Sequence, residues 1–152
     1  LWTRNPEIAV LQACRELGVA FVAFSPLGRG FLAGPVDPAS FDAKDIRRSM
    51  PRFQGEHWTA NQALLADYRQ LAAEAGCSPS QLALAWLLHR GSDILPIPGT
   101  ARVDHLLDNL GADGVALSAS LLERLEALFG PGAIRGDRYG EQARAEVDTE
   151  TV

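Results

Sequence analysis

The residues of this sequence best suited to hold a ligand lie in two glycine-containing loops. The first loop follows the apolar run 20–24 and reads Ser25, Pro26, Leu27, Gly28, Arg29 and Gly30. Its two glycines allow a close approach between backbone and ligand, and successive N–H groups in such a turn form a nest that binds anions. An ordinary turn after a strand explains the same residues equally well, so this loop alone does not establish a site.

The second loop follows the apolar run 94–97 and reads Pro98, Gly99, Thr100, Ala101 and Arg102. We expect a helix to begin at Thr100, and the free N–H groups and partial positive charge of a helix start favour an anion. Arg102 would reach back over that start and bind a phosphate with two hydrogen bonds. Asn109, two turns later, would bond a base or ribose. A capped helix with a surface arginine is the alternative.

Apolar periodicity predicts the elements that carry these loops. Stripes of helical spacing occupy 10–17, 64–72, 82–88, 103–110 and 121–129, and Ser78 with Gln81 forms a capping box before the third. The runs 20–24 and 94–97 are typical of strands buried on both faces. Residues 31–60 have no clear period and predict a long loop, and 130–152 form a polar tail.

Alternation of buried strands and helices predicts an α/β fold with a parallel sheet. Two strands do not make such a core alone, whereas a closed eight-stranded barrel takes about 250 residues. We therefore expect residues 1–152 to be the C-terminal portion of one (β/α)8 TIM barrel domain, with about two of its eight strands. Leu1 as first residue and Met50 as the single methionine also suggest a piece of a longer protein. Phosphate sites in such barrels often form from the loops after the last two strands.

Composition limits the partners. Hydrophobic residues make up 47% and the formal net charge is −5, so we expect no general attraction to nucleic acid and no membrane segment. The two cysteines, Cys14 and Cys77, lack metal-ligand spacing, and we expect no metal site and a cytoplasmic setting.

Several segments, in order, resemble the aldo-keto reductase family. Phe24 to Leu32 is similar to the segment after that family's seventh barrel strand. Pro96 to Thr100, with Arg102, Asp108 and Asn109, resembles the segment after its eighth. Further similarities are Leu1-Trp2, Asp45 with Arg47, Pro51 to Phe53, Gln81 to Trp86, and Gly136 to Tyr139.

The resemblance implies reversible hydride transfer between NADP(H) and a small-molecule carbonyl compound or alcohol. Residues 25–30 would line the cofactor pyrophosphate, and Pro98, Gly99, Thr100 and Arg102 would surround the 2′-phosphate. Asp108 and Asn109 would lie at the adenine end. Ala101 stands where the family commonly has lysine, which would leave Arg102 with more of the charge.

The family's catalytic Asp, Tyr, Lys and His belong to the first half of its barrel, and no matching motif occurs here. We therefore predict no catalytic residue in this chain and no reductase activity by the chain alone. A non-catalytic nucleotide-binding fragment, or an accessory or regulatory subunit, is the alternative, as is a truncated chain without a stable fold. Open barrel edges would favour self-association.

Overall fold

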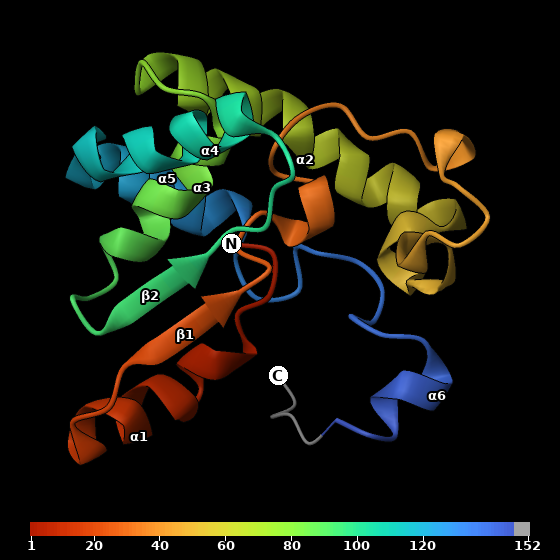
Figure 1. The fold of residues 1–152 in the computed structure, drawn as a ribbon, viewed down its shortest axis with the longest axis horizontal. Helices are drawn as coiled ribbons and strands as arrows, with labels where there is room; N and C mark the ends of the chain where they lie inside the picture. Colours follow the sequence, from red (N-terminus) through yellow and green to blue (C-terminus); the bar gives the residue numbers. More distant parts are fainter. Residues whose placement is uncertain (148–152) are drawn as a thin grey trace.

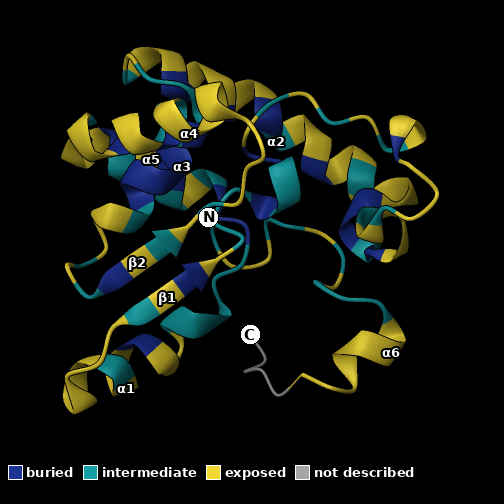
Figure 2. Cartoon of the chain, viewed as in Figure 1, coloured by how far each residue is buried: buried dark blue, intermediate teal, exposed yellow. Residues whose placement is uncertain are grey.

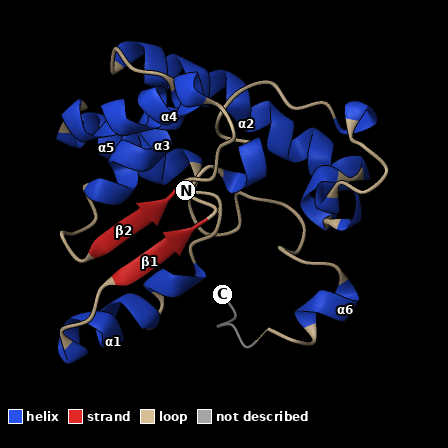
Figure 3. Cartoon of the chain, viewed as in Figure 1, coloured by secondary structure: helices blue, strands red, loops and turns tan. Residues whose placement is uncertain are grey.

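The computed structural model describes residues 1–147 as two parallel strands with helices around them (Figures 1 and 3). The α-helices and strands are α1 (Val10–Leu17), β1 (Phe21–Phe24), α2 (Gly55–Glu74), α3 (Pro79–Leu88), β2 (Ile94–Ile97), α4 (Val103–Leu110), α5 (Ala119–Leu128) and α6 (Glu141–Arg144). Short 3-10 helices are η1 (Asn5–Glu7), η2 (Gly28–Gly30), η3 (Pro38–Ser40), η4 (Ile46–Ser49), η5 (Pro51–Phe53) and η6 (Gly111–Gly114).

The strands pair in parallel and in the order expected of an α/β fold. Phe21 lies opposite Ile94 and Phe24 opposite Ile97, so both strands end at the same edge of the sheet. Pro96 lies within β2, a position that a proline tolerates on an edge strand. The parallel α/β prediction is confirmed, and the loops after both strands leave from one edge.

The sequence predicted that both faces of the two strands are buried. This prediction is correct for one face of the sheet and wrong for the other. Ala23 and Ile94 are buried and pack with Leu11 of α1. The alternate side chains are exposed by about half: Val22 by 51% and Leu95 by 51%. Successive strand residues point to opposite faces, and no described element covers the second face (Figure 2).

The main core lies where α2, α3 and α5 meet the segments around β1. Leu82 to Trp86 of α3 are all buried, which confirms that this helix is apolar on every side. Ser78 caps α3 with the predicted capping box. Tyr68 of α2 packs edge-on against Phe129, with ring centroids 5.5 Å apart.

Two predicted boundaries are wrong. Residues 31–60 are not one loop, because η3, η4 and η5 lie within it and α2 begins at Gly55. The helix after β2 begins at Val103 and not at Thr100. The predicted apolar residues of this helix lie on one face, but that face is exposed: Val103 by 74% and Leu107 by 63%.

The polar tail contains one short helix, α6, within residues 130–147; positions 148–152 of the predicted tail lie outside the described residues. Figure 1 shows the segment after α5 passing the ends of the two strands before it reaches α6. Within residues 1–147, no helix has both the length and the apolarity that a membrane span needs.

Candidate functional site

The loop after β1 is held in a left-handed backbone conformation at four positions. The φ angles are 49° at Ser25, 60° at Gly28, 57° at Arg29 and 92° at Gly30. Left-handed backbone costs a non-glycine residue roughly 1–2 kcal/mol, and strain of this kind concentrates at ligand sites. The Gly28 N–H donates to the Ser25 oxygen (3.0 Å) and the Gly30 N–H to the Leu27 oxygen (3.1 Å). The glycines therefore shape the turn, and their own N–H groups are used inside it.

Gly28 is also needed because Trp2 lies against it. A Cβ atom at Gly28 would lie 2.9 Å from Cγ of Trp2. Trp2 is buried and packs on Phe31, with ring centroids 4.0 Å apart, so it has little room to move. The predicted cofactor residue Gly28 is itself buried and faces Trp2.

The two predicted loops meet across one cleft of about 820 Å³. Every predicted site residue lines this cleft except Gly28 and Arg102, namely Ser25, Pro26, Leu27, Arg29, Gly30, Pro98, Gly99, Thr100, Asp108 and Asn109. The parallel pairing of β1 and β2 brings the loops together, because it places both strand ends at the same edge. A cleft of this size accommodates a cofactor-sized ligand.

Arg102 does not reach over a helix start as predicted. It is the residue that precedes α4, and its Nη2 lies 2.6 Å from Oδ2 of Asp104. Both side chains are exposed by more than half, 66% and 62%. The hydrogen bond from Arg102 lowers the pKa of Asp104 to about 2. Asp104, which the sequence did not single out, lines the cleft in place of Arg102.

The polar end of the cleft is fixed by contacts between α3 and α4. The Ser78 hydroxyl donates to Oδ2 of Asp108 (2.8 Å), and Nε2 of Gln81 donates to the Asp108 carbonyl (2.9 Å). Asn109 beside it is buried. The capping box of α3 therefore also positions the last turn of α4, which carries Asp108 and Asn109 of the predicted adenine end.

Sequence reasoning missed other residues of the cleft. Ser80, in the first turn of α3, lines it, and so do Phe24 and Ile97 at the strand ends. His105 of α4 also lines the cleft. Phe24 and Ile97 could have been predicted from their positions at the strand ends. The position of Ser80 in the cleft depends on how α3 packs against α4, which no local sequence pattern reveals.

The acid–base candidates elsewhere are dispersed. Tyr68 is fully buried, its hydroxyl donates to the Pro79 carbonyl, and burial raises its pKa above the usual value. Lys44 lies in an exposed turn between η3 and η4. In residues 1–147 no group of His, Cys, Asp or Glu side chains is arranged to hold a metal ion.

Comparison with known proteins identifies the family of this chain. The model of the aldo/keto reductase family matches residues 1–129. The aldo-keto reductase yakc [NADP(+)] of Schizosaccharomyces pombe is 41% identical over 148 residues, which are 97% of this chain and 44% of that protein. The chain thus spans less than half the length of this curated relative.

Solved structures agree on the fold. The glycerol dehydrogenase of Gluconobacter oxydans superposes with a TM-score of 0.78 at 20% identity, over 89% of this chain and 41% of its own. An aldo-keto reductase of Klebsiella pneumoniae in complex with NADPH gives 0.59 at 25% identity, over 91% and 39%. The two parallel strands and their helices are thus part of a (β/α)8 barrel, and the chain belongs to the aldo/keto reductase family.

Proposed function

We propose that the cleft between the two loops holds the phosphate groups of NADP(H). The chain would then be part of an oxidoreductase that reduces aldehydes or ketones. One observation carries this proposal: two glycine-containing loops about 70 residues apart in sequence line one cleft at the end of a parallel sheet, where barrels of this kind often bind phosphate. The relative in S. pombe is named for NADP(+), and the K. pneumoniae structure contains NADPH, which supports the same cofactor here.

The side chains of the cleft fit a phosphorylated nucleotide. Arg29 supplies a positive charge at the first loop. Two carboxylates also line the cleft, but each has a donor: Asp104 is bonded to Arg102, and Asp108 to Ser78. Within the described residues, the turn leaves the amides of Leu27 and Arg29 without a backbone acceptor, so these N–H groups are the candidate pyrophosphate donors.

Arg102 would bind the 2′-phosphate only after it leaves Asp104. The pair is exposed, and exposed ion pairs contribute little, so a phosphate with more negative charge than one carboxylate competes well for the guanidinium. This exchange gives Asp104 a role: it holds Arg102 beside the cleft before the cofactor binds.

The cofactor would supply the hydride, and this chain's own residues would bind and orient it. Among the tyrosines, histidines and lysine of the described residues, His105 alone lines the cleft. These residues therefore do not form an acid–base set there. We therefore infer that the chain by itself binds the nucleotide without turning over a substrate. A binding fragment or accessory subunit is the second candidate, and the same dispersion of acid–base groups favours it.

The test is a titration of the purified chain with NADPH and with NADH, followed by tryptophan fluorescence. NADPH should bind more tightly, because NADH lacks the 2′-phosphate. Arg102→Ala should weaken NADPH binding on the order of 10-fold and leave NADH unchanged, as expected for loss of a charge-assisted bond. Asp104→Asn should strengthen NADPH binding, since it releases Arg102.

The matched control is Arg124→Ala, which removes an exposed arginine paired with Glu74; neither residue lines the cleft. Equal losses for both nucleotides in Arg102→Ala would refute the 2′-phosphate assignment. A folded chain that binds neither nucleotide would refute the proposal itself. Steady NADPH consumption with an aldehyde by the pure chain would refute the inference that the chain alone has no catalytic activity.

A further inference from the structure

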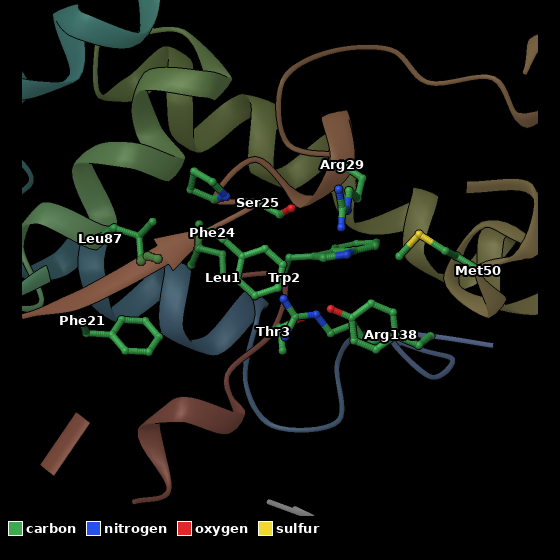
Figure 4. Close-up of a pocket in the computed structure, with 13 residues that line it drawn as sticks. Leu1, Trp2, Thr3, Phe21, Phe24, Ser25, Arg29, Met50, Leu87 and Arg138 are labelled. Carbon is green, nitrogen blue, oxygen red and sulfur yellow. The ribbon is translucent and has the colours of Figure 1, made fainter. Parts of the chain in front are cut away.

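A second cavity, of about 100 Å³, adjoins the cofactor cleft at the end of β1 (Figure 4). The two spaces share Phe24, Ser25, Pro26 and Arg29 as lining residues. A small group bound in the second cavity would therefore lie next to the cleft. A substrate that exchanges hydride with a bound cofactor must also lie beside that cofactor, and this cavity offers such a place.

The polar wall of this cavity consists of hydrogen-bond donors and hydroxyl groups, with two arginines and no carboxylate. Arg29 and Arg138 reach it from opposite sides of Trp2 in the view of Figure 4. The Trp2 side chain is buried, and its Nε1–H has no acceptor in the described residues. A buried donor without an acceptor is unfavourable, and an oxygen atom of a bound anion would satisfy it.

Arg138 carries a positive charge that no carboxylate of the described residues neutralises. The adjacent Asp137 is bonded to Arg144 instead, with Nη1 2.5 Å from Oδ2. The Arg138 guanidinium lies 4.4 Å from the ring centre of Phe24 and 5.2 Å from that of Tyr139. Burial lowers the pKa of Arg138, and the charge of Arg29 acts in the same direction. Two cations that face one cavity favour an anion between them.

The segment that carries Arg138 is fixed by buried contacts to the long loop and α2. Asn61 is fully buried, and its Nδ2 donates to the carbonyls of Arg52 (3.1 Å) and Arg135 (2.9 Å). The Arg135 N–H donates back to Oδ1 of Asn61 (2.7 Å). Nε of Arg52 donates to the Gly136 carbonyl (3.1 Å). The guanidinium of Arg138 is thus presented from an anchored backbone, two residues beyond the last of these bonds.

We propose that this cavity is an anion subsite in which Arg138 and the indole N–H of Trp2 bind a carboxylate group of the substrate, beside the Arg29 that serves the cofactor cleft. The preferred substrates would be carbonyl compounds that also carry a carboxylate. An arginine matches a carboxylate with two parallel hydrogen bonds, which gives the subsite orientation as well as affinity. This assignment rests on the proposed cofactor site, but it predicts a ligand of its own.

The probe is acetate, with acetamide as its neutral counterpart, and the signal is the NMR shift of the Trp2 indole N–H in the purified chain. Acetate should bind saturably with and without NADPH, and acetamide should not. Arg138→Gln should weaken acetate binding at least about 10-fold, and Arg138→Lys less. Arg124→Gln, which breaks the distant pair with Glu74, should change nothing. NADPH affinity should be the same in all these variants.

Several results would overturn the subsite. Equal binding of acetate and acetamide would do so, as would acetate binding that Arg138→Gln and Arg138→Lys both leave unchanged in folded protein. Competition between acetate and NADPH, with Arg138→Gln weakening both, would assign Arg138 to the cofactor phosphates. A chain that binds NADPH but not acetate refutes only the subsite. A chain that binds acetate through Arg138 but not NADPH supports the subsite and refutes the proposed cofactor site.

Discussion

Replacement of Gly28 by alanine tests whether the first loop depends on its contact with Trp2. The backbone at Gly28 has φ of +60°, and the new Cβ would meet Cγ, Cδ2 and Cβ of Trp2 at 2.9, 3.2 and 3.3 Å. These atoms lie near the base of a buried side chain that packs on Phe31, so the ring cannot turn aside. The loop backbone must therefore shift.

The magnitude follows from two separate costs. An alanine in left-handed backbone costs roughly 1–2 kcal/mol. A methyl group forced into a packed site costs about 1–3 kcal/mol more. Gly18→Ala is the matched control, because Gly18 has φ of +67° and a Cβ there would have no neighbour within 4 Å. Gly28→Ala should therefore reduce the free energy of unfolding by roughly 2–5 kcal/mol, and Gly18→Ala by only the first cost.

The assay is urea unfolding of both variants, with the NADPH titration run on the folded protein. Gly28→Ala should also weaken NADPH binding, because the shifted loop lines the cleft through Leu27 and Arg29. A loss of stability no greater than that of Gly18→Ala would show that the contact with Trp2 does not constrain Gly28. If Gly28→Ala loses more stability than Gly18→Ala but keeps full NADPH affinity, the loop after β1 does not take part in cofactor binding.

Two further predictions concern the segments that frame the site. Asn61→Ala leaves buried backbone groups of Arg52 and Arg135 without partners, at about 1–3 kcal/mol each, and should speed tryptic cleavage near Arg138; an unchanged cleavage rate would contradict the anchoring role. The hydrogen bonds from Arg47 lower the pKa of Asp45 to about 2 from 3.8, so its contribution to stability is complete above pH about 4 and is lost as the pH falls towards 2. Asp45→Asn should accordingly flatten the fall of the urea midpoint between pH 4 and pH 2, and an equally steep fall in the variant would show that this pair is not the cause.

The sequence predicts most of this architecture because its signals are local. Gly18 ends α1 in the left-handed conformation, and Ser78 with Gln81 caps α3, as their spacing indicates. The two loops could be placed together because parallel strands share one edge. Residues 55–63 were missed as helix because the strong apolar spacing begins only at Leu64, while the first turns of α2 are polar and largely exposed.

The side chains at the site are arranged differently from the prediction for another reason. Arg102 was expected to face a phosphate because a helix start attracts anions, but an aspartate two residues later competes for the same guanidinium. Thr100 was expected at the helix start, whereas its hydroxyl accepts from the Arg102 N–H and ends the turn before α4. Side chains satisfy one another before a ligand arrives, and a motif does not encode that competition.

Trp2 shows why the second cavity could not be predicted at all. It touches Gly28 of the cofactor loop, its carbonyl accepts from Nη1 of Arg52 (2.8 Å), and its indole N–H lies unsatisfied between two arginines. These contacts join the start of the chain to the loop after β1 and to η5. Any change that moves Trp2 should therefore alter both the cofactor loop and the anion subsite. If Gly28→Ala weakens acetate binding as well as NADPH binding, while Arg138→Gln weakens only acetate, the two sites are distinct but share this one side chain.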